Sequence, residues 1–167
     1  MLVVLSDTHA RVSPRLSESV CQALESAAVV AHAGDFTTEA SLETFEQRSE
    51  RLIAVSGNRD TAPVRTRVPA QQTFSYGDRR FVLVHGHRHD PTSLSLLARQ
   101  ERADVVLVGH THRPAIERLE SHVVLNPGSH ADPRGNRTGF AVFEPDGEQL
   151  VGRLMTTEGD VFETVRV

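Results

Sequence analysis

Lysine is absent from this chain of 167 residues, so all 18 of its basic residues are arginine. Its absence excludes Schiff-base chemistry, a pyridoxal-phosphate lysine and a Walker-type phosphate-binding lysine. Basic residues are also outnumbered, because 22 acidic residues give a formal charge of −4 and a pI near 6.1. A chain without a basic surplus is not expected to bind nucleic acid stably, and small charged substrates suit it better.

Cysteine and long apolar runs are equally scarce. The single cysteine, Cys21, cannot form an internal disulfide and is expected to be a buried thiol in a helix. No apolar run approaches the roughly 18 residues of a membrane-spanning helix. The N-terminus, MLVVLSDTHA, is a poor signal peptide because its apolar stretch is short and lacks a basic flank. We therefore expect a cytoplasmic protein without a membrane partner, folded as one domain over residues 1–167.

The first half of the chain alternates short apolar runs with amphipathic stretches. Strands are expected at residues 2–5, 28–32 and 52–55, and helices near 14–27, with Pro14 near the first turn, and 39–49. This alternation predicts parallel strands joined by helical crossovers. Functional sites in such sheets lie beyond the carboxyl ends of the strands.

From residue 71 the pattern changes to paired strands. The segment QTFSYGDRRFVLVHG predicts a hairpin around its Gly-Asp pair. A helix near 91–102 is expected next, and then strands at 105–108, 115–119, 122–125, 139–144, 149–155 and 161–165. Glu-Pro-Asp-Gly at 144–147 predicts a turn between two of these strands. The whole pattern predicts an α/β fold with mixed sheets.

Five short polar clusters each follow an apolar run. They are Ser6-Asp7-Thr8-His9, Gly34-Asp35, Gly57-Asn58-Arg59-Asp60, His85-Gly86-His87 and Gly109-His110-Thr111-His112. Each cluster would project from the carboxyl end of a strand, where several loops converge. In extended chain, the paired side chains of Asp-x-His and His-x-His lean to the same side and can reach one ion or two neighbouring ions. Carboxylates combined with imidazoles suit Mn²⁺, Fe and Zn²⁺.

The clusters supply about the number of ligands that two ions need when each keeps positions open for water and substrate. One of these ligands must be shared between the ions. A carboxylate has two oxygens for that purpose, and Asp35, which follows a glycine, is the candidate bridge.

These blocks resemble the pattern of the calcineurin-like metallophosphoesterase superfamily: Asp-x-His, Gly-Asp, Gly-Asn, a lone His and Gly-His-x-His. All five blocks occur in that order within residues 1–113. The segments LVHGH at 83–87 and VVLNPGS at 123–129, with Pro133-Arg134 after them, resemble the small bacterial and archaeal phosphodiesterases related to the retromer scaffold subunit. The resemblance implies a four-layer αββα sandwich, in which helices flank two mixed β-sheets.

Carried over by position, the resemblance also implies a site for two divalent metal ions. Asp7, His9 and His112 would hold one ion, Asn58, His85 and His110 would hold the other, and Asp35 would bridge them. Mn²⁺ is the expected metal, with Ni²⁺, Zn²⁺, Fe²⁺ or Mg²⁺ as alternatives. A metal-bound hydroxide would then attack phosphorus in line. Asn58, Asp60 and His85 are expected to act in catalysis, Asp60 by orienting a ligand.

Arg59 departs from the wider superfamily, many members of which have a histidine at this position. Arginine binds a phosphate through two hydrogen bonds, but it does not release a proton near neutral pH. The small phosphodiesterases also commonly lack this histidine. Arg59 and His87 are therefore expected to bind substrate, although His87 can also simply fill the mouth of the site. Diesters with good leaving groups are the expected substrates.

The sequence thus predicts a phosphodiesterase that acts on small phosphate esters. A phosphomonoesterase of the same fold and a non-catalytic protein-interaction scaffold of the same fold are the alternatives, but the scaffold's metal-site pattern is incomplete, whereas every position is filled here. A homo-oligomer is compatible with the sequence. Structural roles are expected for His32, His89, His122 and His130. Residues 126–129 are expected to form a strand-ending turn and Arg134 to lie on a solvated loop, with an anion-binding backbone loop at 128–129 and a phosphate contact of Arg134 as the alternatives.

Overall fold

The computed structural model describes all residues 1–167 and divides its eleven strands between two sheets. The first sheet contains β1 (Leu2–Leu5), β2 (Val29–His32), β3 (Leu52–Ala54), β9 (Phe140–Asp146), β10 (Gln149–Met155) and β11 (Val161–Arg166), in the order β11-β10-β9-β1-β2-β3. The second contains β4 (Gln71–Tyr76), β5 (Arg79–Val84), β6 (Val105–Leu107), β7 (Ala115–Arg118) and β8 (Val123–Asn126), in the order β4-β5-β6-β8-β7.

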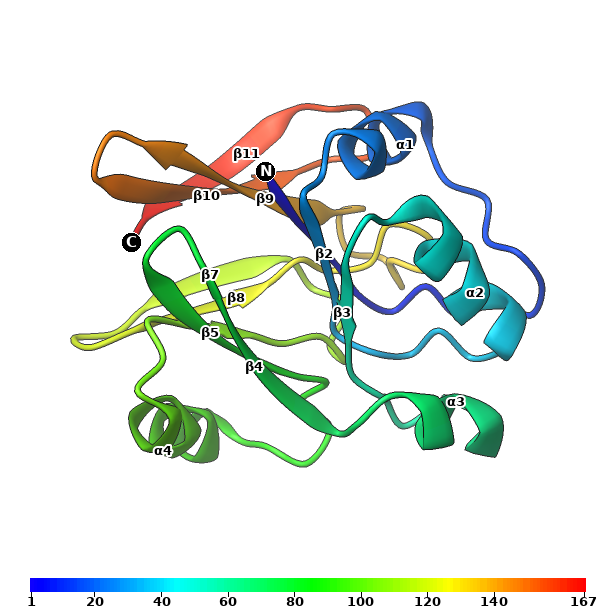
Figure 1. Ribbon diagram of the computed structural model, residues 1–167, viewed down its shortest axis with the longest axis horizontal. Helices are drawn as coiled ribbons and strands as arrows, with labels where there is room; N and C mark the ends of the chain where they lie inside the picture. The colour runs from blue at the N-terminus through cyan, green and yellow to red at the C-terminus, as the bar shows by residue number, and fades with distance from the viewer.

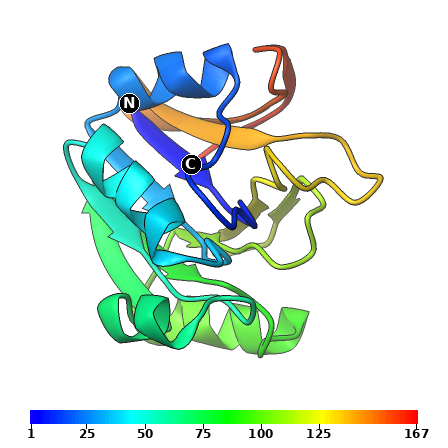
Figure 2. The same ribbon diagram turned by 90° about the vertical axis from the view of Figure 1, so that its right-hand side faces the viewer.

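Helices cover the outer face of each sheet (Figures 1 and 2). Helices α1 (Glu18–Glu25), α2 (Glu39–Arg48) and α3 (Ala62–Arg67) pack on the six-stranded sheet, and α4 (Pro91–Glu101) packs on the five-stranded sheet. Between the sheets lies the largest core cluster, which includes Phe81 and Phe143 in edge-to-face contact. The layers therefore run α, β, β, α, and the predicted four-layer sandwich with two mixed sheets is confirmed.

Strand β1 is buried along its whole length because it has a core on both faces. Leu2 and Val4 point into the core between the sheets, while Val3 and Leu5 point toward the helices. A central strand covered on both sides needs apolar residues at every position, which accounts for the continuous run LVVL.

Both sheets contain a parallel set of strands. Strand β2 pairs in parallel with β1 and β3, and β6 pairs in parallel with β5 and β8. Parallel strands bring the loops at their carboxyl ends to one edge of a sheet. The predicted βα pattern of the first half is therefore observed, and it sets up the candidate site.

Two helix predictions need correction. Helix α1 begins after Ser17, whose hydroxyl accepts a hydrogen bond from the Val20 N–H, so Pro14 precedes the helix instead of lying in its first turn. Helix α3 was not expected. It has only six residues, too few for an amphipathic period to be visible in the sequence.

Of the two predicted turns, one is confirmed and one is shifted. Gly77 and Asp78 both have positive φ, as the tight turn between β4 and β5 requires. The second turn lies at residues 147–148, because β9 continues through Pro145 to Asp146. Pro145 is tolerated there because the carbonyl of Leu150, the residue opposite it, accepts from the Val167 N–H and needs no donor at position 145.

No helix of this structure has the length and apolar character needed to cross a membrane.

Candidate metal centre

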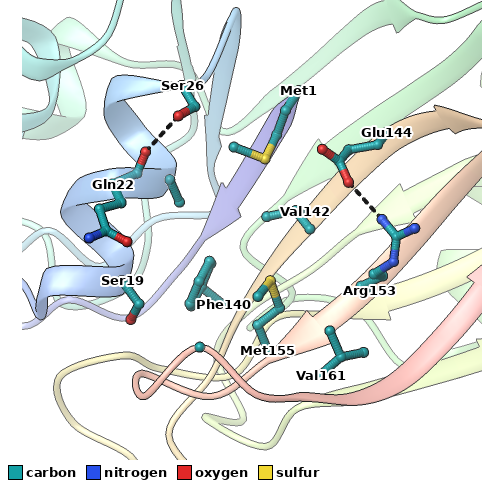
Figure 3. A pocket seen from close by; sticks show the side chains of 12 residues that line it. Met1, Ser19, Gln22, Ser26, Phe140, Val142, Glu144, Arg153, Met155 and Val161 are labelled. Atoms are coloured by element: carbon teal, nitrogen blue, oxygen red, sulfur yellow. Dashed lines mark hydrogen bonds and ion pairs between the residues drawn. The ribbon is translucent and has the colours of Figure 1, made fainter.

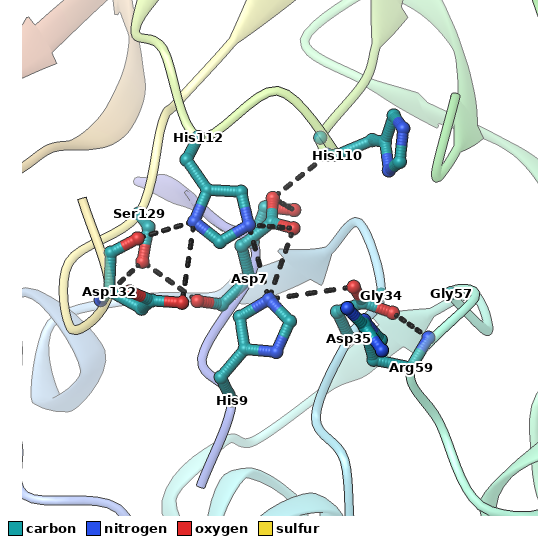
Figure 4. Close-up of polar contacts among 12 residues, drawn as sticks. Asp7, His9, Gly34, Asp35, Gly57, Arg59, His110, His112, Ser129 and Asp132 are labelled. Atoms are coloured by element: carbon teal, nitrogen blue, oxygen red, sulfur yellow. Dashed lines mark hydrogen bonds and ion pairs between the residues drawn. The ribbon is translucent and has the colours of Figure 1, made fainter. Parts of the chain in front are cut away.

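The seven predicted ligands come from loops at the carboxyl ends of five strands. Asp7 and His9 follow β1, Asp35 follows β2, and Asn58 follows β3. From the other sheet, His85 follows β5, while His110 and His112 follow β6. Figure 4 shows the side chains of Asp7, His9, Asp35 and His112 turned toward one another. The structure therefore brings together residues that are up to 105 positions apart, from Asp7 to His112.

One group of ligand atoms consists of Asp7 Oδ1, His9 Nε2 and His112 Nε2. His112 Nε2 lies 3.2 Å from Asp7 Oδ1 and 3.1 Å from His9 Nε2. The other ring nitrogen of His112 donates to the Asp132 carbonyl, so in the neutral ring Nε2 carries the lone pair. Asp7 Oδ1 is buried without any hydrogen-bond partner. A buried carboxylate oxygen with no donor is the arrangement that a cation would satisfy.

A second group of atoms surrounds the Asn58 side chain. Asn58 Oδ1 lies 3.0 Å from His85 Nε2 and 3.0 Å from His110 Nδ1. His85 Nδ1 donates to the Ala33 carbonyl at 2.7 Å, which leaves the Nε2 lone pair facing Asn58. Two acceptor atoms that face each other repel unless a proton or a cation lies between them.

Asp35 lies between the two groups. Its Oδ2 is 3.5 Å from His9 Nε2 on one side and 3.3 Å from His85 Nε2 on the other. Its Oδ1 accepts a hydrogen bond of 2.7 Å from the Arg59 N–H, which fixes the carboxylate in this orientation. Asp7, Asp35 and His85 also form a group close enough to share one ion. Carboxylate, amide and imidazole donors together suit divalent first-row metals, so these residues fit the metal ions that the sequence predicts.

His85 and Asp35 shift each other's pKa. Burial acts to lower the pKa of His85, but the Asp35 carboxylate outweighs it, and the pKa of His85 is raised. Burial acts to raise the pKa of Asp35, but His85 and the Arg59 N–H outweigh it, and the pKa of Asp35 is lowered. The His110 imidazole differs, because burial and the neighbouring His85 lower its pKa. Without metal, the pair therefore favours a protonated His85 beside an ionised Asp35.

Five of the seven ligands have a left-handed backbone. The φ angle is 54° at Asp7, 48° at His9, 60° at Asp35, 70° at His110 and 58° at His112. Residues other than glycine rarely adopt this conformation, and they do so mainly at functional sites. The i, i+2 spacing of Asp-x-His and His-x-His predicted an extended chain at both pairs, and this prediction is wrong. The paired side chains reach the same centre because the backbone turns at each ligand.

Glycine is required where the ligand loops meet. A Cβ atom on Gly57 would lie 2.1 Å from Asp35 Oδ1, and one on Gly109 would lie 1.9 Å from Ser6 Oγ. Neither distance is possible for real atoms. Because they have no side chain, Gly57 can lie against the loop of Asp35 and Gly109 against the loop of Asp7.

Of the residues that support the predicted ligands, Ser6 and Asp132 were given no role from the sequence. Ser6 Oγ donates to Asp7 Oδ2 at 2.6 Å, and the carbonyl of Asp132 orients His112. Ser129 Oγ donates to the Asp7 carbonyl at 2.7 Å and is completely buried. Asn126 Nδ2 donates to the Gly109 carbonyl at 2.8 Å. The turn at 126–129 therefore holds the Asp7 and His110 loops, and its Asn-Pro-Gly-Ser motif was the only sequence signal for this role.

Asp60, Arg59 and His87 occupy different positions around the ligands. The buried Asp60 carboxylate accepts hydrogen bonds from the N–H groups of Asp35, Thr37 and Gly57, so it ties two ligand loops together. The Arg59 side chain is exposed beside Asp35 (Figure 4). His87 is half-buried with its ring centroid 5.3 Å from that of His85, and burial lowers its pKa.

The remaining histidines lie outside the ligand set. His32 and His130 are buried behind the site, where both bond to Thr8 Oγ1, at 2.9 Å and 3.1 Å. Burial lowers the pKa of each, that of His130 to about 4. His89 precedes α4, and His122 precedes β8 at the far end of the strand from the site.

A cavity of about 460 Å³ lies away from this centre, between α1 and the outer face of β9 and β10. Figure 3 shows Phe140, Val142 and Met155 lining it, with the Glu144–Arg153 ion pair at its rim. None of the seven ligands lines this cavity. This cavity is therefore separate from the candidate metal centre.

Residues 1–148 match the family described as the calcineurin-like phosphoesterase superfamily domain. A probable metallophosphoesterase of Methanothermobacter thermautotrophicus is 34% identical over 166 residues, which cover 96% of this chain and 95% of that protein. Vacuolar Protein Sorting 29 from Cryptosporidium parvum has a similar structure, with a TM-score of 0.84 at 19% identity, covering 99% of this chain and 96% of that chain. YfcE, a phosphoesterase from E. coli, gives a TM-score of 0.78 at 24% identity, covering 98% of this chain and 97% of that chain. The two structural likenesses show a shared fold.

Proposed function

Because this chain belongs to the calcineurin-like phosphoesterase superfamily, as its sequence predicts, we propose that it is a phosphodiesterase that hydrolyses small phosphate esters with two divalent cations. Membership makes it a metallophosphoesterase. The diester preference, the two-ion centre and the residue roles are the proposal. We also propose Mn²⁺ as the metal.

The observation that carries the proposal is the set of acceptor atoms gathered at the centre. Asp7 Oδ1 has no donor, and the Nε2 atoms of His85 and His112, whose Nδ1 atoms donate to backbone carbonyls, face other acceptors. Folding buries these groups together only if something offsets their repulsion. Two cations would do so and would also relieve the cost of the five left-handed ligand residues.

The two groups support an assignment of the seven predicted ligands to two ions. Asp7, His9 and His112 would hold one ion, Asn58, His85 and His110 would hold the other, and Asp35 would bridge them. When bound, such ions lower the pKa of water and stabilise charge on phosphoryl oxygens. Asp35 suits the bridge because its Oδ2 lies within 3.5 Å of a ligand atom from each group.

The chain's own groups bind and orient the substrate. Arg59 presents a permanent positive charge beside Asp35, where it can donate to two phosphoryl oxygens. His87, whose pKa is lowered, is neutral near pH 7 and can contact the ester next to His85 and His110. Because Arg59 holds its proton, the site favours leaving groups that need no protonation. Asp60 acts through the loops it joins and does not face the reacting atoms.

The test uses purified protein stripped of metal and assayed with chromogenic monoesters and diesters. Mn²⁺, Ni²⁺, Mg²⁺ and Zn²⁺ are added back one at a time. We expect the diester to be hydrolysed faster than the monoester, with Mn²⁺ giving the highest rate. The Asp35→Asn variant should lose activity with every metal, because it removes a charge from both ion sites at once.

A non-catalytic protein-interaction scaffold is the alternative, and the fold likeness to Vacuolar Protein Sorting 29 motivates it. The complete ligand set favours the enzyme. Wild-type protein that binds two equivalents of Mn²⁺ but turns over neither ester would support the scaffold instead.

A further inference from the structure

A cavity of about 550 Å³ adjoins the candidate metal centre at His9 and is called here the His9 cavity. The side chains that matter for its chemistry are Thr8, His9, Pro14, Arg15, Leu16 and His130. His9 belongs to both places, because its Nε2 lies 3.5 Å from Asp35 Oδ2. A molecule in the His9 cavity therefore sits directly beside the reaction site. Its volume is within the range of small-molecule sites, about 300–1,000 Å³.

A chain of hydrogen bonds determines which group His130 presents to the His9 cavity. The Gly34 N–H donates to His32 Nδ1 at 3.2 Å, so the proton of neutral His32 is on Nε2 and is donated to Thr8 Oγ1. The Thr8 hydroxyl has no other acceptor within reach, so its own proton is donated to His130 Nε2, 3.1 Å away. The proton of His130 is consequently on Nδ1, which has no partner within the chain. His130 is 7% exposed and lines the cavity, and Nδ1–H is the one polar group of its ring left for a bound molecule.

Arg15 supplies the charge of the His9 cavity. Its side chain is exposed and takes part in no ion pair or side-chain hydrogen bond, whereas Arg67, Arg153 and Arg166 are each paired with a carboxylate. No acidic side chain lines the His9 cavity. The cavity therefore offers hydrogen-bond donors and positive charge, together with the apolar surfaces of Pro14 and Leu16.

We propose that the His9 cavity binds the second ester group of a phosphodiester, the group that does not leave, and that this group carries acceptor oxygens, as a nucleoside does. Arg15 and the His130 N–H would donate to those oxygens, and Pro14 and Leu16 would contact the ring. The inference rests on the proposed phosphodiesterase function. It explains why a diester is preferred: a simple monoester has no group to place in the cavity.

The experiment compares two chromogenic esters that release the same p-nitrophenolate. One is thymidine 5′-monophosphate p-nitrophenyl ester, a phosphodiester whose second ester group has acceptor oxygens. The other is p-nitrophenyl phenylphosphonate, a phosphonate monoester in which a plain phenyl ring takes the place of that second group. Steady-state kinetics are measured with Mn²⁺ for the wild type, Arg15→Ala and Arg11→Ala. Arg11 is a matched control because it is exposed in the same loop but does not line the cavity.

We expect Arg15→Ala to raise KM for the thymidine ester about tenfold relative to the phenylphosphonate, which is the loss of one hydrogen bond to a charged group. The value of kcat should change much less, since the lost interaction is uniform binding. Arg11→Ala should behave as wild type on both esters. His130→Phe, which keeps the ring but removes the N–H, should shift the same KM ratio in the same direction.

Two outcomes overturn the inference while leaving the proposed function intact. In the first, Arg15→Ala changes KM equally for both esters. In the second, Arg11→Ala and Arg15→Ala have the same effect, so that only the general charge of the loop matters. If the wild type hydrolyses neither ester with any of the four metals, the proposed function fails and this inference fails with it.

Discussion

The Gly57→Ala variant tests whether the close contact between the Gly57 and Asp35 loops positions the Asp35 carboxylate, the proposed bridge. The added Cβ would lie 2.1 Å from Asp35 Oδ1, 2.6 Å from Asp35 N and 2.7 Å from Asp35 Cγ. An ordinary contact to a carboxylate oxygen needs a separation of about 3.4 Å or more, so Asp35 must move by about 1 Å. That shift breaks the hydrogen bond of 2.7 Å from the Arg59 N–H and changes the distances from Oδ2 to His9 and His85.

Two magnitudes follow from this displacement. Forcing a methyl group into a packed site costs typically about 1–3 kcal/mol, which for a chain of this length lowers Tm by about 6 °C. A catalytic group misplaced by about 1 Å can lower the rate about 100-fold. Loss of activity should therefore greatly exceed what the loss of stability explains, because the variant stays folded at 25 °C.

The assay measures kcat/KM with bis-p-nitrophenyl phosphate and Mn²⁺, together with thermal unfolding in the presence of Mn²⁺ or EDTA. Gly147→Asn is the control, since its site is open and asparagine tolerates the positive φ of 62° there. Wild-type protein should be stabilised by Mn²⁺, and Gly57→Ala should lose most of that stabilisation. If the variant keeps wild-type kcat/KM and the full rise in Tm, the claim that Gly57 positions Asp35 is wrong.

Three further predictions concern single side chains. Arg59→Ala should raise KM and leave kcat much less affected, because Arg59 only binds the substrate. Arg59→His should raise kcat by up to about 100-fold, mainly for esters with poor leaving groups, measured with alkyl and nitrophenyl diesters. Equal wild-type rates on both kinds of diester, with chemistry rate-limiting, would contradict the claim that the site lacks a general acid. Asp60→Asn should lower Tm and Mn²⁺ affinity without moving the pH profile of kcat, because Asp60 only accepts backbone hydrogen bonds, and a shifted profile would show a direct proton role. Burial lowers the pKa of His130 to about 4, so between about pH 6.5 and pH 4 its imidazole is protonated in the unfolded chain but not in the folded chain. The free energy of unfolding should therefore fall by about 3 kcal/mol as the pH falls through that window, which urea unfolding in EDTA measures. In His130→Phe this loss should be absent, and an unchanged pH dependence would assign the effect to other groups.

Much of the fold can be predicted from the sequence because local patterns control it. The apolar run at β1 and the Gly-Asp turn at 77–78 each reflect a requirement that neighbouring residues satisfy among themselves. Helix α3 and the true start of α1 could not be predicted in this way. A six-residue helix shows no period, and whether Ser17 or an earlier residue caps α1 depends on where the chain leaves the sheet edge.

For the candidate site, the sequence by itself predicted the set of candidate ligands and that they follow strands, since residue type and strand order are local properties. Only the tertiary structure decided how they meet. The left-handed backbone at Asp7 and His112, the buried Asp7 Oδ1 without a donor and the contact of Gly57 with Asp35 all arise between loops of different strands. The hydrogen bonds of Asp60, which join two loops, and of Ser129, which donates to Asp7 across 122 positions, also form only in the folded chain. These interactions depend on the packing of two sheets, and no pattern confined to one stretch of chain can encode which loops that packing brings into contact.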